Sequence, residues 1–171
     1  VQIELAEVSN RYGQHSKAKS RYNNAARIAQ RELEKAENQA DKSALENKIL
    51  QAKIQAAITS YEIGKPEDGS QIIQALAESN PDHAMLDYAT GQIAKFNDDS
   101  EGAISAFTIA LGKNPRLSVA AVALSELYLK LEQRDQAVST LEKYLSQNRY
   151  DRQTRKKLNA LKNQSKESSP Q

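Results

Sequence analysis

The stretch EGAISAFTIALGKNP, Glu101 to Pro115, decides how the rest of the sequence is interpreted. Its order is Ala103, then Phe107 four places on, then Ala110, with Asn114-Pro115 closing the segment. This spacing places a small and a large apolar residue on one face of an amphipathic helix. The proline then ends the helix, because it cannot continue the backbone hydrogen bonding. The same order of residue types recurs along the chain, so the stretch is interpreted as one unit of a repeat.

The period of this repeat comes from two Asn-Pro pairs, Asn80-Pro81 and Asn114-Pro115, which lie 34 residues apart. Units 50–83, 84–117 and 118–151 follow from that spacing, preceded by a longer first unit at about 1–49. Every unit has a small residue followed at the fourth place by a larger one: Ala18 and Tyr22, Gly69 and Ile73, Ala103 and Phe107, Ala137 and Leu141. We expect each unit to be two antiparallel helices that bury their apolar faces by stacking on their neighbours.

The 34-residue pattern resembles that of the tetratricopeptide repeat (TPR) family over about residues 1–163. The resemblance implies an all-α fold, namely a right-handed α-solenoid of antiparallel helix pairs in one domain, 1–164, with a C-terminal capping helix at 152–164. The bulky aromatic residue usual near the start of each unit in this family is replaced by Lys53, Asp87 and Ala121. Residues 165–171 are expected to form a disordered tail, because their composition is polar.

The first unit is about seventeen residues longer than the period. We expect one long helix from Ser16 to about Ala40, and a second helix that starts at Ala44 behind the capping box Ser43-x-x-Glu46. The first hairpin then projects beyond the stack, in a way similar to the extended units of kinesin light chains. Two interpretations of this extension stay open: a solvated pair of helices, or an arm that binds a partner.

The amino-acid composition argues against several classes of protein. The 24 basic and 22 acidic side chains give a formal charge of +2, which argues against a dedicated nucleic-acid binder. No Cys is present, so disulfides and thiolate chemistry are excluded. No apolar run approaches the length of a membrane span, and no signal peptide is evident. Because the sequence starts at Val1 and not at Met, we expect a fragment or processed form of a longer protein.

The sequence offers few candidates for catalytic or metal-binding residues. His83 and Asp87 share a helical face, but two ligands do not make a metal site, and His15 stands apart from them. The acidic stretch 98–101 is better explained by helix capping than by calcium binding, because it lacks alternating oxygen ligands. No phosphate-binding loop and no nucleophile–base order is present. We therefore predict a protein that is not an enzyme, with no metal and no cofactor.

In TPR proteins the first helix of each unit lines a concave groove for a partner, and the resemblance implies such a groove here. The places that usually point into it hold Ile54, Ile58, Tyr61, Met85, Tyr88, Gln92, Phe96, Val119, Val122 and Glu126. This largely apolar set predicts a non-catalytic interaction module, or scaffold, that binds a helical or extended apolar segment of a partner protein. The alternative is self-association, or docking within the chain, through the same face.

Two further partner classes can be assessed from the residues. Arg152, Arg155, Lys156 and Lys157 form a candidate basic patch on the last helix, which could contact nucleic acid or an acidic surface. Nucleic acid is the less favoured partner, because no aromatic residues are interleaved for base stacking. The carboxylate clamp of TPR co-chaperones needs Lys and Asn at places that here hold Ile54/Ile58 and Val122/Glu126, so we expect no binding of heat-shock chaperone tails. The identity of the partner and the compartment stay open.

Overall fold

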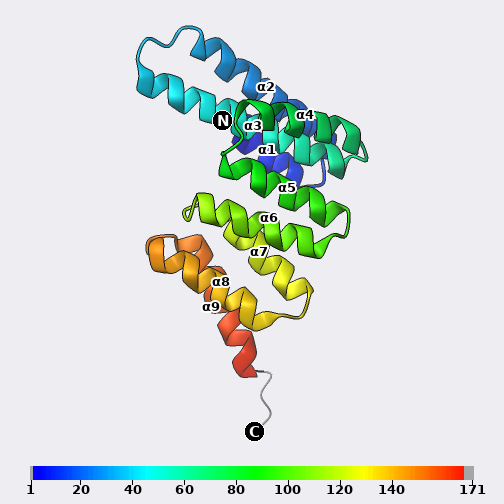
Figure 1. Cartoon of the computed structure of the whole chain (residues 1–171), viewed down its shortest axis with the longest axis vertical. Helices are drawn as coiled ribbons and strands as arrows, with labels where there is room; N and C mark the ends of the chain where they lie inside the picture. The colour runs from blue at the N-terminus through cyan, green and yellow to red at the C-terminus, as the bar shows by residue number, and fades with distance from the viewer. Residues whose placement is uncertain (1, 168–171) are drawn as a thin grey trace. The chain divides into compact units, whose positions relative to one another are not determined.

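The computed structural model describes residues 2–167, and within them the chain is helical and contains no strand (Figure 1). Its helices are α1 (Gln2–Arg11), α2 (His15–Leu33), α3 (Gln39–Glu62), α4 (Pro66–Ser79), α5 (Ala84–Phe96), α6 (Ser100–Lys113), α7 (Ser118–Lys130), α8 (Arg134–Gln147) and α9 (Arg152–Glu167). None of the described helices is long and apolar enough to span a membrane. The chain divides into two compact units, Val1–Ala89 and Thr90–Gln171, and each is described by itself.

The turn inside each helix pair has one backbone signature. The second residue after the first helix has a left-handed conformation, with φ of 71° at Gly13, 72° at Gly64, 55° at Asp98 and 59° at Glu132. The next amide closes the turn by reaching back along the first helix, as from Gln133 N to Tyr128 O at 2.8 Å. Three of these positions, 64, 98 and 132, are spaced by the 34-residue period. The backbone therefore confirms the helix pairs that the sequence pattern predicts.

The left-handed turn leads to a first prediction, because Glu132 has a side chain where the conformation favours glycine. Replacing Glu132 with Gly should raise the free energy of unfolding by about 0.5–1 kcal/mol, since it relieves the left-handed strain. Urea denaturation of the full chain should show this gain. The control is Gly64→Ala at the equivalent turn, which should lower stability because Gly64 has a φ of 72°. A Glu132→Gly chain that unfolds at lower urea than the wild type would contradict the prediction.

An asparagine caps the second helix of three pairs. Asn80, Asn114 and Asn148 follow α4, α6 and α8 at intervals of 34 residues. Asn148 has no proline after it, yet its Nδ2 donates to Tyr144 O and to Pro115 O, both at 2.9 Å. The second bond joins the turn after α8 to the turn before α7. The recurring asparagine, and not the proline alone, therefore marks the end of these three pairs.

Close packing inside the pairs depends on glycine. A Cβ placed on Gly91 in α5 would lie 2.5 Å from the ring of Phe107 in α6, which is fully buried. A Cβ on Gly69 in α4 would lie 2.6 Å from the ring of Tyr61 in α3. Real Cβ contacts are not this short, so only glycine lets the two helices approach this closely.

The long helices α2 and α3 run side by side and extend past α1 as an arm (Figure 1). Ala29, Leu45 and Ile49 are buried between them, with Leu33 packed against this cluster. The expected boundaries are wrong here: α2 ends at Leu33 and α3 already begins at Gln39. The reason is Asn38, which has an extended backbone and accepts a hydrogen bond from Asp41 N at 2.8 Å. This cap starts the helix five residues before the Ser43-x-x-Glu46 box.

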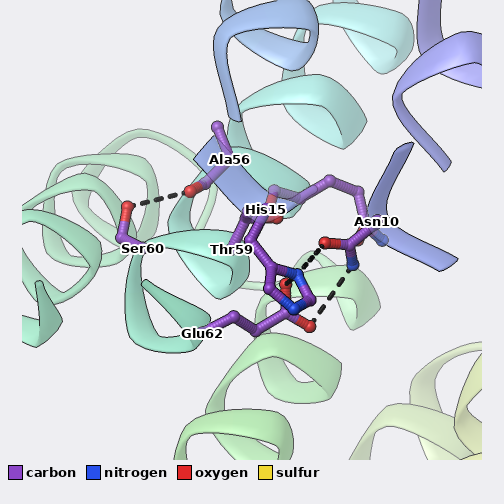
Figure 2. Close-up of polar contacts among 7 residues, drawn as sticks. Asn10, His15, Ala56, Thr59, Ser60 and Glu62 are labelled. Atoms are coloured by element: carbon purple, nitrogen blue, oxygen red, sulfur yellow. Dashed lines mark hydrogen bonds and ion pairs between the residues drawn. The ribbon is translucent and has the colours of Figure 1, made fainter. Parts of the chain in front are cut away.

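The base of the arm is joined by polar contacts between three helices and their turns. The His15 ring lies between Asn10 and Glu62, with Nδ1 2.6 Å from Asn10 Oδ1 and 3.1 Å from Glu62 Oε2 (Figure 2). Asn10 Nδ2 also donates to Glu62 Oε1 at 3.3 Å. Beside them, burial raises the pKa of the Tyr22 phenol to about 12, and the nearby Glu7 and Glu62 add to the effect.

The last helix is longer than predicted. Helix α9 runs to Glu167, so residues 165–167 are helical where a disordered tail is expected. The remaining residues of that expected tail, 168–171, lie outside the part that the structure describes. Leu158 of α9 is buried against Leu141, Tyr144 and Leu145 of α8, and this apolar contact covers the end of the Thr90–Gln171 unit.

Candidate functional site

A groove between α7 and α9 contains two residues of the predicted partner surface, Val122 and Glu126. Its volume is about 220 Å³. One wall is α7 and the other is α9, and the lining residues are Val122, Ser125, Glu126, Leu129, Leu141, Lys157, Ala160 and Leu161. We call this the α7/α9 groove. All of its residues belong to the Thr90–Gln171 unit.

The α9 wall is fixed by the residue that precedes it. Asp151 Oδ1 accepts hydrogen bonds from the backbone N–H groups of Gln153 and Thr154, both at 3.0 Å. Its Oδ2 accepts from Thr154 Oγ1 at 2.8 Å and from the Tyr144 hydroxyl at 3.0 Å, which ties the helix start to α8. Burial raises the pKa of Asp151, but the hydrogen bonds that its carboxylate accepts lower this pKa by more. The pKa of Asp151 is therefore below its usual value. The start of α9 is thereby held in place.

Further polar contacts hold the rest of α9. Arg134 Nη2, at the start of α8, donates to Leu161 O, and Lys162 Nζ lies 2.5 Å from Glu142 Oε1. Together with the buried Leu158, these contacts position Ala160 and Leu161 beside α7. The groove therefore has two walls that are anchored independently of any ligand.

One ion pair crosses the groove. Lys157 Nζ of α9 lies 2.5 Å from Glu126 Oε1 of α7, and both side chains are about half exposed. Exposed pairs of this kind contribute little to stability, on the order of 0–1 kcal/mol. A ligand can therefore displace this contact at small cost. On the same helix, Lys156 makes no ion pair with the described residues.

Three of the predicted groove residues are not accessible. Ile54 is fully buried, and Ile58 and Tyr88 are nearly so. Their expected exposure is wrong, because they pack into the core of the Val1–Ala89 unit, where Tyr88 lies close enough to Tyr22 to add to the rise of its pKa. Tyr88→Ala would therefore test folding and not partner binding.

The other predicted residues keep some exposure. Tyr61 is half-buried over Gly69 and its hydroxyl lies 2.5 Å from Ser70 Oγ, so it links α3 to α4. Met85 and Gln92 are also half-buried, while Phe96 is exposed. Val119 and Glu126 are exposed and Val122 is half-buried, all on α7. The structure brings Val122 and Glu126 together in the α7/α9 groove.

The structure also brings together two surfaces that the sequence predicts as separate. Lys157, predicted as part of a basic patch, faces Glu126, predicted as part of the apolar groove. The contributions of Ala160 and Leu161 to the same hollow were not anticipated. Their signal in the sequence is their spacing, since they follow Lys157 by three and four residues and so share its side of the helix. Arg152 and Arg155 lie outside the groove lining.

A second hollow, about 420 Å³ in volume, lies between α6 and α8. Leu111, Leu124 and Tyr144 contribute apolar surface to it, and Thr108, Thr140, Lys143 and Gln147 contribute polar groups. It contains none of the residues predicted to contact a partner.

The histidines have local structural contacts. His15 belongs to the contact with Asn10 and Glu62, and His83 Nδ1 accepts from Met85 N at 3.3 Å at the start of α5. Burial lowers the pKa of His83, with Asp87 acting in the opposite direction. Across residues 2–167, no three His, Cys, Asp or Glu side chains gather in a way that could hold a metal ion.

No protein-family model matches the sequence, and no curated protein matches it. Solved structures do match. The TPR protein TTC0263 of Thermus thermophilus has a TM-score of 0.55 at 17% identity, over 94% of this chain and 96% of that one. The MamA protein has a TM-score of 0.50 at 16% identity, over 94% and 78%. The assembly chaperone of RpL4, Acl4, has a TM-score of 0.50 at 13% identity, over 97% and 67%. The fold of this chain is therefore that of the tetratricopeptide-repeat proteins, in the α-solenoid class.

Proposed function

We propose that this chain is a non-catalytic protein-interaction module, and that the α7/α9 groove holds a segment of its partner. The observation that carries the proposal is the groove itself. Val122, Leu129 and Leu161 offer apolar surface in a hollow whose walls are already fixed. A preformed site of this kind binds without an ordering cost on its own side.

The residues that line the α7/α9 groove and its edge indicate further properties of the partner segment. The segment presents apolar side chains to the hollow, as a helix or as an extended strand. The cations Lys156 and Lys157 on α9 favour a carboxylate beside those apolar residues, which would compete with Glu126 for Lys157. The TPR-type fold supports the general role, because stacks of helix pairs present extended surfaces to other proteins.

The test compares three chains in crosslinked pull-downs: the wild type, Val122→Glu in the groove, and Ile109→Glu on the exposed side of α6. Proteins recovered by the wild type and by Ile109→Glu should be lost from Val122→Glu, with unchanged circular dichroism in all three. For the segment mapped by its crosslinks, Leu129→Ala should weaken the measured affinity by about 1–3 kcal/mol. Equal recoveries from all three chains would contradict the proposal.

Self-association through the same face predicts a different result. The wild type would then form a dimer whose fraction rises with concentration, and Val122→Glu would be monomeric. Sedimentation velocity over a concentration series distinguishes this outcome from the binding of a different protein.

A further inference from the structure

The hollow of about 420 Å³ between α6 and α8, here called the α6/α8 hollow, shares no lining residue with the α7/α9 groove. Both of its helices pack on α7, and Leu124 of α7, which is 5% exposed, is part of its lining. The lining runs over 108–115 along α6 and 140–147 along α8, which is about two helical turns or roughly 10 Å. Sites for small molecules have volumes of about 300–1,000 Å³, so the hollow has the size of such a site.

Much of the polar surface of the hollow is already bonded within the protein. Thr108 Oγ1 and Thr140 Oγ1 each donate to a carbonyl oxygen four residues earlier, both at 2.7 Å. The Tyr144 hydroxyl donates to Asp151 Oδ2 at 3.0 Å, so its ring is left as apolar surface together with Leu111. Because these hydroxyls have partners, an apolar body can cover them without leaving a donor unsatisfied.

Gly112 leaves space on the α6 side of the hollow. Glycine is unfavourable inside a helix, and here no close contact requires it, since an added Cβ would meet nothing within 4 Å. Its backbone does not have a positive φ either. The missing side chain therefore contributes open volume to the hollow and no closer packing.

The charge that lines the hollow is positive. Lys143 is the one charged residue of the lining, and it makes no ion pair with the described residues. Gln147 lies four residues later on the same side of α8, and its side-chain amide has no hydrogen bond within 2–167. An ammonium group and an amide one turn apart can both donate to the oxygens of a single carboxylate.

Nearby acidic side chains do not cancel this charge. Glu142 Oε1 lies 2.5 Å from Lys162 Nζ of α9, and the Asp151 carboxylate accepts the hydrogen bonds that fix the start of α9. Asp135 is eight residues before Lys143, about 12 Å along the helix. None of these three acids lines the hollow. The charged residues next to Gly112 and Pro115 in the sequence are both basic, namely Lys113 and Arg116.

From this arrangement we propose that the α6/α8 hollow binds a small apolar carboxylic acid. The carboxylate lies between Lys143 and Gln147, and the apolar body covers Leu111, Leu124 and the ring of Tyr144. A partner helix fits less well, because two turns of helix, about 10 Å wide and 10 Å long, are larger than the hollow. The inference goes beyond the proposed function and uses none of its residues, so either one can fail alone.

The test titrates the isotope-labelled full chain with naphthoate, a rigid apolar carboxylate, and with the matched cation naphthylmethylammonium. Amide resonances of 108–115 and 140–147 should shift, and naphthoate should bind about tenfold or more tightly than the cation. Lys143→Gln should reduce this preference to about twofold or less. The control is Lys130→Gln, which removes an exposed charge of α7 outside the lining and should leave the preference unchanged.

A second variant, Gly112→Leu, separates loss of binding from loss of folding. The leucine should occupy part of the hollow and weaken naphthoate binding about tenfold or more. The urea midpoint should be no lower than that of the wild type, because leucine is the better helix former and meets no neighbour at its Cβ. Ile109→Ala, on the exposed side of α6 and outside the lining, should bind naphthoate as the wild type does.

Four results would overturn the proposal. Naphthoate could leave the amides of the hollow unshifted, or bind the Gly112→Leu chain as tightly as the wild type. The Lys143→Gln chain could keep the full preference for naphthoate over the cation. An acetylated tripeptide that ends in two leucines with a free carboxylate could bind the hollow more tightly than naphthoate, which would make the C-terminus of a protein the occupant.

Discussion

Phe107→Ala should lower the free energy of unfolding of the region around α6 by about 3–5 kcal/mol, the usual cost of deleting a buried aromatic ring. Phe107 is fully buried and its ring lies directly against Gly91, which has no side chain to fill the resulting cavity. Because the chain has two compact units, the loss should be local. Hydrogen exchange of amides in α6 and α7 of the full chain measures it by region.

The control for this prediction is Phe96→Ala. Phe96 is 44% exposed, so the same truncation should change exchange in α6 and α7 far less. Phe96 and Phe107 are the two phenylalanines of the sequence. The two variants therefore compare the same truncation at an exposed and at a buried position. Equal effects from both variants would show that Phe107 does not have the packing role described here.

Gly91→Ala should lower the free energy of unfolding by about 1–3 kcal/mol, although alanine is the better helix former. The added methyl would lie 2.5 Å from the Phe107 ring, so the ring or the helix α5 must move. Urea denaturation of the full chain gives the change. A matched control is Gly112→Ala in α6, where an added Cβ meets nothing within 4 Å.

That control should have the opposite sign. Gly112→Ala should raise stability by up to about 1 kcal/mol, because it gains helix propensity without crowding. If Gly91→Ala were also stabilising, the helices α5 and α6 would have to be further apart than the structure places them.

The repeat register was predictable from the sequence because it depends on residues whose physical role is local. Gly91 and Phe107 specify a close helix contact, and Asn114-Pro115 specifies a turn, whatever the rest of the chain does. The expected helix pairs are accordingly confirmed. The predicted start of α3 is wrong because Asn38 and the Ser43 box are both plausible caps, and the structure uses Asn38, whose side chain accepts a hydrogen bond from Asp41 N.

The candidate site was less predictable, since it depends on contacts between elements. Assigning groove residues by their place in a unit assumes equal exposure in every unit. Ile54 contradicts that assumption, because the second half of α3 is largely buried, while Val122 on α7 keeps access to the groove. The meeting of Glu126 with Lys157 required the position of α9, which is set by the cap at Asp151.

The arm formed by α2 and α3 has a consequence for how this chain can change in length. Gly13 and Gly64 are 51 residues apart, 17 more than the period, and the surplus is shared between two antiparallel helices that meet at one tip. Helical turns that are added to or removed from α2 and α3 in equal numbers at that tip leave the loops at Gly13 and Gly64 in the same relation to each other. The tip is thus a place where insertions and deletions alter reach and leave the phase of the repeats intact, so the arm can lengthen or shorten independently of the rest of the fold.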